Sequence, residues 1–275
     1  AAELAMGSRT PCRVFYDLDT PVTLARMDAG ERVAYIGPRG LADFDLVLSY
    51  TGGAALDELR GRLGARRVAP LYGHVDPAVH RPVQPAERFR ADLSYIGTYA
   101  DDRQRMLEAL LIEPARHLPE RRFVIAGAQY PQDFPWTGNI HFVKHLPPDQ
   151  HPAFYSSSRL TLNVTRAAMA AMGWCPSGRL FEAAACGAPV LTDWWAGLDA
   201  FFTPGQEVLV AHGADEAVAA LDLGDAELRR IAGRARERTL AEHTADRRVD
   251  DLMRALDGGF TPAADIRSDI RSAEA

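Results

Sequence analysis

The sequence has little cysteine and no long apolar run. Its three cysteines, Cys12, Cys175 and Cys186, cannot all pair with one another and lack the spacing of metal ligands. We therefore expect reduced thiols and a cytoplasmic location. No apolar run approaches the ~20 residues of a membrane-spanning helix, and the first residues lack the basic and hydrophobic regions of a secretion signal. The chain begins with Ala rather than Met, so we expect a fragment or a processed product.

The sequence also lacks an excess of basic charge. Its formal net charge is −6, so nucleic acid and anionic membranes are not expected partners. His74, His80, His145 and His151 lie in loops or at the ends of expected elements, and none of these four has the i, i+4 spacing with Glu that marks a metal-binding helix. We expect no metal site and no cofactor.

Short β-rich segments alternate with helical ones from end to end. Strands are expected at 13–18, 44–50, 67–73, 92–97, 122–127, 140–146, 159–164, 189–193 and 207–211. Most are apolar nearly throughout, which is typical of parallel strands covered on both faces. Helices are expected at 55–63, 102–117, 148–157 and 178–186, with two or three more across 214–257. The alternation predicts an α/β fold with parallel sheets.

A proline-containing stretch without periodicity, 71–89, predicts a linker between two units. We divide the chain into a partial N-terminal unit (1–74), a linker (75–90), a C-terminal domain with six strands (91–258) and a disordered tail (259–275). Three strands are few for a freestanding domain, so we expect the N-terminal unit to be truncated.

The first candidate loop follows the strand that ends at Gly97. In open α/β sheets ligands bind beyond the carboxyl ends of the strands. Gly97 would let a phosphate approach the backbone, Thr98 or Asp101 would cap the next helix, and Arg103 would add a bidentate contact. A glycine is also common in any turn of this kind, so an ordinary turn is the alternative.

The second loop leads into the segment PSGRLFEAAACGAPVLTD, 176–193. Ser177 is a suitable N-cap residue and Gly178 would begin the helix. Arg179 in the first turn is unfavourable for the helix dipole, and a bound anion would resolve that conflict. Arg166, just after the preceding strand, could converge on the same point. In the alternative reading, Arg166 and Arg179 form ordinary surface ion pairs.

Glu182 is the one carboxylate on this small-residue helix. Small residues allow close packing against the sheet, so Glu182 should face the open side, where it could accept hydrogen bonds from adjacent ribose hydroxyls. The alternative is an exposed helical glutamate without a ligand.

The third loop begins at Asp193, which ends a strand and is followed by two tryptophans and Gly197. An acid and aromatic rings beside such a turn suit a sugar or a base, but packing is the expected role of Trp194 or Trp195. Two further acids, Asp17 and Asp19, could perform acid/base chemistry. We interpret them instead as part of a turn and a cap.

These residues together resemble glycosyl transferases group 1, and in particular the spore-maturation-type glycosyl transferase-like proteins. The resemblance covers most of 92–255 and is most specific over 177–210, in PSGRLFEAAACGAPVLTD and FFTPGQEVLVA. The linker YGHVDPAVHRP is similar to the hinge of that superfamily, with His74 in place of Gly and His80-Arg81-Pro82 in place of Phe-x-Pro.

The resemblance implies a GT-B fold, in which two Rossmann-like domains face each other and the C-terminal one holds a nucleotide-diphosphate sugar without a metal. Glu182 then matches the glutamate that holds the ribose. Ser177, Gly178 and Arg179 fall where the diphosphate would lie, and Gly97 matches the glycine-rich turn. Arg179 and Arg103 are the expected catalytic residues, and the expected donor-binding residues are Gly97, Thr98, Arg166, Ser177, Gly178, Glu182 and Asp193.

The sequence departs from the superfamily in more than one respect. The paired Arg and Lys of the superfamily's C-terminal domain have no clear match, and Arg103 and Arg166 are the suggested substitutes. Retaining members carry a glutamate eight positions before the ribose-binding one, and that position is Trp174 here. The expected function is sugar transfer to an unknown hydroxyl acceptor. The alternative is a nucleotide-sugar-binding module without catalysis, because the acceptor half is incomplete. A dinucleotide oxidoreductase is disfavoured because no G-x-G-x-x-G follows a strand.

Overall fold

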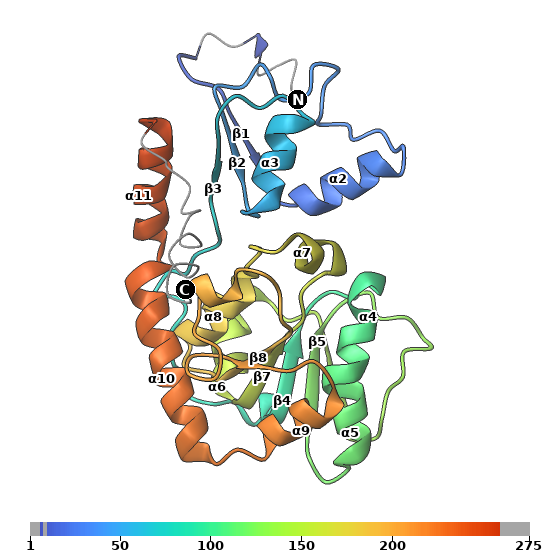
Figure 1. Cartoon of the computed structure of the whole chain (residues 1–275). Helices are drawn as coiled ribbons and strands as arrows, with labels where there is room; N and C mark the ends of the chain where they lie inside the picture. The colour runs from blue at the N-terminus through green and yellow to red at the C-terminus, as the bar shows by residue number, and fades with distance from the viewer. Residues whose placement is uncertain (1–5, 8–9, 259–275) are drawn as a thin grey trace, which may run out of the picture.

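The computed structural model describes residues 6, 7 and 10–258, so the expected tail at 259–275 lies outside the described residues. The described chain forms two parallel β-sheets, each with helices packed against it, joined by the linker (Figure 1). The α/β fold with parallel sheets is confirmed.

The first sheet has the order β1-β2-β3, formed by β1 (Val14–Asp17), β2 (Leu46–Ser49) and β3 (Val68–Pro70). Helices α2 (Thr20–Asp28) and α3 (Ala54–Gly61) pack on one face through a core that includes Leu24, Val47 and Leu59. The sequence analysis missed α2. Asp19 is its N-cap residue without a side-chain cap bond, and Pro21 occupies the first turn, where its missing N–H costs nothing.

The second sheet has six strands, the number that the sequence predicts, and their order is β6-β5-β4-β7-β8-β9. They are β4 (Ala91–Ile96), β5 (Phe123–Gly127), β6 (Ile140–Lys144), β7 (Ser158–Asn163), β8 (Val190–Thr192) and β9 (Leu209–Val210). The order reverses at β4, which pairs with β5 on one side and with β7 on the other. Crevices form beyond the carboxyl ends of strands at such a reversal.

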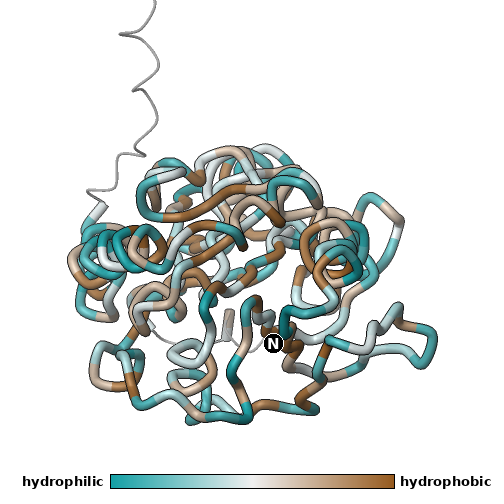
Figure 2. Tube along the Cα trace, turned by 90° about the horizontal axis from the view of Figure 1, so that it is seen from below, coloured by the Kyte–Doolittle hydropathy of each residue, from teal (hydrophilic) through white to brown (hydrophobic). Residues whose placement is uncertain are grey.

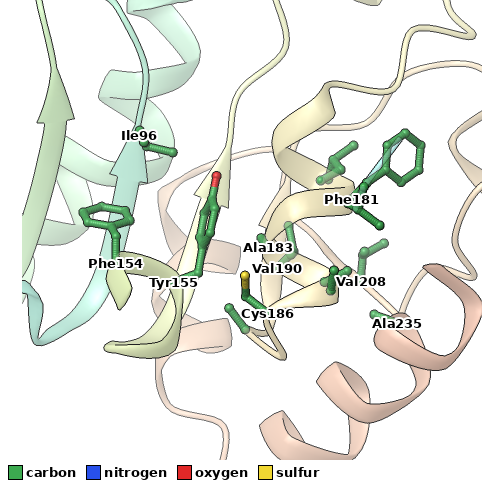
Figure 3. Close-up of a cluster of buried hydrophobic side chains, with 14 of the residues drawn as sticks. Ile96, Phe154, Tyr155, Phe181, Ala183, Cys186, Val190, Val208 and Ala235 are labelled. Carbon is green, nitrogen blue, oxygen red and sulfur yellow. The ribbon is translucent and has the colours of Figure 1, made fainter. Parts of the chain in front are cut away.

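Helices cover both faces of this sheet (Figure 1). On one face lie α4 (Asp101–Leu107), a π-helical turn (Glu108–Ile112), α5 (Glu113–His117) and α9 (Ala214–Leu221). On the other lie α6 (His151–Ser156), α8 (Gly178–Ala185) and α10 (Asp225–Glu242). Figure 3 shows Phe154 and Tyr155 of α6 and Phe181 of α8 in the core between the larger sheet and these three helices. Figure 2 shows hydrophobic stretches inside and hydrophilic residues on the outer helices.

The last helix, α11 (Ala245–Leu256), returns to the first sheet (Figure 1). Its Leu252, Ala255 and Leu256 pack against Leu46, Leu48 and Ala69 of that sheet. Arg67 donates hydrogen bonds to the carbonyl groups of Ala255 and Leu256, at 2.5 and 3.1 Å. The sequence analysis grouped these residues with the C-terminal domain, whereas their contacts tie the two units together.

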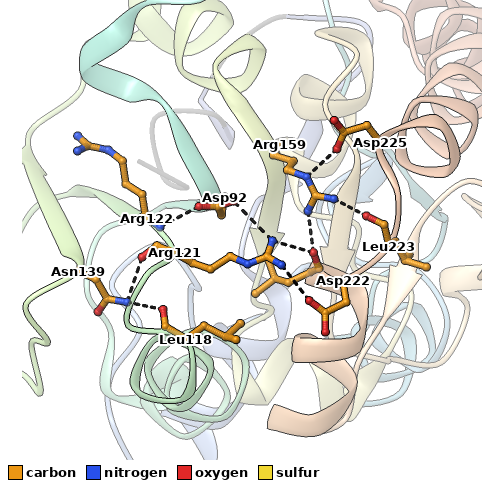
Figure 4. Close-up of polar contacts among 10 residues, drawn as sticks. Asp92, Leu118, Arg121, Arg122, Asn139, Arg159, Asp222, Leu223 and Asp225 are labelled. Carbon is orange, nitrogen blue, oxygen red and sulfur yellow. Dashed lines mark hydrogen bonds and ion pairs between the residues drawn. The ribbon is translucent and has the colours of Figure 1, made fainter.

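Ion pairs lie at the amino-terminal ends of the strands in the larger sheet (Figure 4). Arg121 lies 3.6 Å from Asp92 and 2.9 Å from Asp222, and Arg159 lies 2.8 Å from Asp225. These arginines are matched by carboxylates at this end. At the carboxyl-terminal end of the sheet, by contrast, Arg103 and Arg179 form no ion pair with a carboxylate of the described residues.

Candidate functional site

The start of α8 is built as the sequence predicts. Gly178 is its first residue, and the hydroxyl of the N-cap residue Ser177 accepts a hydrogen bond from the Arg179 amide at 3.4 Å. No acid lies in the first turn to balance the positive end of the helix dipole. The amide end of α8 is therefore suited to an anion.

Gly178 has no evident structural reason to be glycine. Its φ is not positive, and a Cβ there would meet only the Tyr50 hydroxyl at 3.5 Å and Glu182 Oε1 at 3.8 Å, which are ordinary contacts. Alanine would restrict the unfolded chain more and favour the helix. A ligand that approaches the backbone from this side would explain the missing side chain.

Three arginines lie in one neighbourhood beside this helix start. Burial lowers the pKa of Arg103, and the like charges of Arg179 and Arg166 lower it further, against the opposing effects of Tyr95 and Asp102. The Arg103 Nε and Arg179 Nη1 groups are buried without a hydrogen-bond partner. Among the described residues, neither arginine forms an ion pair. Buried donors of this kind are expected to have an acceptor when a ligand is bound.

Arg166 differs from the other two arginines. Its Nε lies 3.0 Å from Asp102 Oδ2, so the ion-pair reading holds for Arg166. The pair holds the loop after β7 against α4, because Asp102 lies in the first turn of α4.

The expected caps of α4 are absent from the structure. Its N-cap residue is Ala100, without a side-chain cap bond, so the predicted cap by Thr98 or Asp101 is wrong. Thr98 instead offers its backbone carbonyl to Arg103 Nη1 at 3.2 Å. The helix start lies two residues later than a Thr98 cap would require, which leaves Thr98 in the loop.

Gly97 has a structural reason for being glycine. A Cβ there would lie 2.6 Å from the Tyr95 hydroxyl, and its carbonyl lies against Gly127. Its carbonyl also accepts a hydrogen bond from the Tyr130 hydroxyl at 3.1 Å. The ordinary-turn reading therefore accounts for Gly97 without a ligand.

Glu182 is held by a neighbour and is not a freely exposed helical glutamate. Its side chain is 23% exposed, and its Oε2 lies 3.4 Å from His151 Nδ1. Burial opposes ionisation, but His151, with His80 and Arg179, outweighs that effect and lowers the pKa of Glu182. The side chain is thus kept as a carboxylate, the form that accepts hydrogen bonds from hydroxyl groups.

Asp193 is buried and accepts hydrogen bonds from another loop of the protein. It is 4% exposed, and its Oδ1 accepts hydrogen bonds from the Thr165 amide at 2.9 Å and the Thr165 hydroxyl at 3.0 Å. Burial raises its pKa, although those hydrogen bonds oppose the increase. The structure gives the Asp193 Oδ1 the role of joining the loops after β7 and β8. Trp195 is buried, which confirms packing for one tryptophan, whereas Trp194 is 46% exposed.

Asp17 likewise forms hydrogen bonds within the protein, to residues that follow it closely in the sequence. It is buried, and its Oδ1 accepts hydrogen bonds from the Asp19 amide at 3.1 Å and the Thr23 hydroxyl at 3.3 Å. This arrangement agrees with a structural turn at the start of α2.

None of the helices in the described part of the chain is long and apolar enough to cross a membrane. The three cysteines are free thiols; Cys175 and Cys186 are buried as expected, whereas Cys12 is exposed.

A family model described as "Glycosyl transferase-like" matches residues 103–254, which is more than half of the chain and includes Arg103, Arg166, Arg179 and Glu182. The chain belongs to this glycosyl transferase-like family. No curated protein matches the sequence.

This glycosyl transferase-like protein is similar to several solved structures. The Anabaena protein HepE in complex with UDP and glucose has a TM-score of 0.68 at 14% identity, with 89% of this chain and 71% of that chain covered. Sucrose-phosphate synthase from Thermosynechococcus elongatus has a TM-score of 0.61 at 17% identity, with 80% and 60% covered. AviGT4, a glycosyltransferase of avilamycin A biosynthesis, has a TM-score of 0.54 at 21% identity, with 93% and 77% covered.

At such identities the likeness shows the fold, and the expected GT-B fold is confirmed. This glycosyl transferase-like chain spans 60% of the synthase chain and 45% of the S. aureus TarM chain.

Trp174, where retaining members of the superfamily carry a glutamate, joins the two units of this family member. Its carbonyl accepts a hydrogen bond from the Gly52 amide at 2.9 Å, and its amide donates to the Ala196 carbonyl at 2.7 Å. Its ring leaves no room for a side chain on Gly53 or Gly197, whose Cβ positions would lie 2.5 and 2.6 Å from ring atoms. Trp174 itself has a φ of 50°, which is uncommon outside glycine.

Three features of this site carry little or no signal in the sequence. The loop before α8 contains a further helix, α7 (Ala167–Met172), and Trp174 and Tyr50 bring the first unit against the second. The departure at the Trp174 position is the one sequence signal that pointed to this contact. A single tyrosine after a strand, as at Tyr50, carries no such signal.

Proposed function

We propose that this protein transfers a sugar from a nucleotide-diphosphate sugar to a hydroxyl acceptor without a bound metal. The observation that supports this most strongly is the pair Arg103 and Arg179, in the first turns of α4 and α8. The charge of Arg179 helps to lower the pKa of Arg103, and each of the two guanidinium groups keeps a buried N–H without an acceptor. A diphosphate would supply both the opposite charge and the acceptors.

The remaining residues then have defined roles. The amides at the start of α8, with Ser177 and Gly178, would face the diphosphate. Glu182 would accept hydrogen bonds from the ribose hydroxyls one turn further along the helix. Arg166, held by Asp102, would add positive potential from the loop after β7.

The arginines are proposed to stabilise the negative charge of the leaving diphosphate electrostatically. As the bond between the sugar C1 and the diphosphate oxygen breaks, its electron pair leaves with the diphosphate. A new bond forms between C1 and the acceptor oxygen, whose hydroxyl proton passes to the departing diphosphate. Fixed donors aimed at that growing negative charge stabilise the transition state more than the ground state. Arg179 and Arg103 are therefore the proposed catalytic residues.

A panel of sugar donors tests this proposal. The first donors to try are uridine diphosphate sugars, because HepE was solved with UDP and glucose and with UDP-glucose. Release of nucleoside diphosphate, measured with and without glycerol-like or peptide acceptors, should occur and should fall in an Arg179→Ala variant. Absence of both release and binding would overturn the proposal. Placement in the spore-maturation-type branch and a cytoplasmic location stay predictions.

The second candidate is a nucleotide-sugar-binding module without catalysis. It is favoured by Trp174, whose indole lies between Gly53 of the first unit and Gly197 of the second. Saturable donor binding without release of nucleoside diphosphate, in the presence of every acceptor tried, would support this candidate over transfer.

A further inference from the structure

The first unit, although its sheet has three strands, places one side chain beside the start of α8. Tyr50 directly follows β2, and its amide donates a hydrogen bond to the Asp17 carbonyl at 2.9 Å, which extends the pairing of β1 and β2. This anchor directs the chain at the carboxyl end of the first sheet toward the second unit.

The Tyr50 hydroxyl lies at the space left by the missing Gly178 side chain. That oxygen is 3.5 Å from the position of a Gly178 Cβ, and Glu182 Oε1 is 3.8 Å from the same position. The hydroxyl also lies against Gly73 of the first unit, where a side chain would collide with it. The hydroxyl, the helix start and the Glu182 carboxylate thus face one small volume.

The Tyr50 hydroxyl is available to donate a hydrogen bond. Among the described residues, no hydrogen bond engages it, whereas the Tyr16 hydroxyl donates to the Leu71 carbonyl at 2.6 Å. Burial raises the pKa of Tyr50, and the nearby Tyr16 and Glu182 raise it further against Arg179 and Arg248. The phenol therefore keeps its proton at neutral pH and can donate it in a hydrogen bond to an anionic oxygen.

We propose that Tyr50 is a diphosphate-binding residue, which donates a hydrogen bond from the first unit to a diphosphate oxygen at the start of α8. The inference rests on the proposed donor site and adds to it a contact from the opposite unit. The donor site is then formed by both units, and the diphosphate itself helps to hold them together.

Calorimetric titration of Tyr50→Phe with UDP, inorganic pyrophosphate and uridine tests the inference. A hydrogen bond to a charged acceptor predicts an affinity loss of about tenfold or more for UDP and pyrophosphate, with uridine unchanged. Tyr72→Phe is the matched control, because the Tyr72 ring lies at the same junction but away from Gly178. Its centroid lies 4.8 Å from that of the Phe201 ring, and its hydroxyl lies against Gly52. That variant should bind UDP like the wild type.

The outcomes separate the two proposals. If the wild type binds UDP or pyrophosphate and Tyr50→Phe binds them equally well, the role of Tyr50 is overturned and the donor site stands. An equal loss for uridine, or an equal loss in Tyr72→Phe, also overturns it, because either result shows a general effect at the junction. If the wild type binds none of the nucleoside diphosphates ADP, GDP, UDP and dTDP, nor pyrophosphate, the donor site and the Tyr50 contact both fail.

Discussion

His151 Nδ1 lies 3.4 Å from Oε2 of Glu182, so one oxygen of this carboxylate is engaged by the protein and the other faces Gly178. His151 begins α6 and Glu182 lies in α8, so the contact also fixes two neighbouring helices. A side chain held in this way loses little rotamer freedom when it accepts a ligand. That preorganisation is the reason to expect a measurable role for Glu182 in nucleoside binding.

Glu182→Ala should weaken the binding of nucleosides and nucleoside diphosphates by about 1–3 kcal/mol, because the ribose hydroxyls lose their acceptor. The measure is calorimetric titration with uridine and UDP, each of which carries the ribose. Glu216→Ala is the control, since Glu216 forms a similar pair with His212 at 3.1 Å on the surface. An unchanged dissociation constant in folded Glu182→Ala protein would contradict the ribose assignment.

Arg179→Ala should weaken UDP far more than uridine, because its guanidinium is proposed to contact the diphosphate. Loss of a hydrogen bond between charged groups predicts about 1.5–3 kcal/mol. Arg230→Ala serves as the control, because Arg230 pairs with Glu227 on the exposed side of α10. Equal losses for UDP and uridine would exclude a phosphate role for Arg179.

Gly178→Ala should separate binding from stability. The backbone there accepts an alanine, so the free energy of unfolding should stay equal or rise by about 0.4–1 kcal/mol, while UDP affinity falls. Gly233→Ala in α10 is the control, because nothing lies within 4 Å of a Cβ there and the same gain in stability should leave UDP binding intact. Urea unfolding and calorimetry on the two variants give the comparison. Unaltered UDP affinity in Gly178→Ala would show that no ligand needs that space.

Much of the fold could be predicted from the sequence because the strands are continuous apolar segments. All nine expected strands are present, since burial on both faces requires that pattern. Helices α2 and α7 were missed, because their apolar residues give no clear helical period and their roles depend on the contact between the two units. Periodicity within a segment carries no information about such a contact.

The candidate site could be predicted in part, for a similar reason. Ser177, Gly178, Arg179 and Glu182 belong to one short segment, so local helix chemistry was enough to find them. Asp193 was assigned to a ligand because its position at a strand end suits one, but its partner Thr165 comes from a different loop. Tyr50 reaches the site from the first unit, and only the tertiary structure brings it to Gly178.

The pH dependence of stability should reveal a buried histidine at the end of α10. His243 packs against Phe181 at 4.4 Å between ring centroids, and its Nδ1 lies 2.7 Å from the Arg248 Nη2. Burial, with the charge of Arg248, lowers the pKa of His243 from 6.5 to about 3. The neutral ring can accept a hydrogen bond from Arg248, whereas a protonated ring would face a like charge in a buried place.

Because the folded pKa lies below the unfolded one, this contribution to stability is complete above pH 6.5 and is lost as the pH falls toward 3. The free energy of unfolding should decrease by about 1.4 kcal/mol for each pH unit in that window from this group alone. Urea unfolding of the wild type between pH 7 and pH 5 measures the slope, above the range in which the Glu182 carboxylate titrates. His243→Asn should be less stable at pH 7 and should have a flatter slope over the same range. A slope as steep in His243→Asn as in the wild type would show that another group takes up the proton.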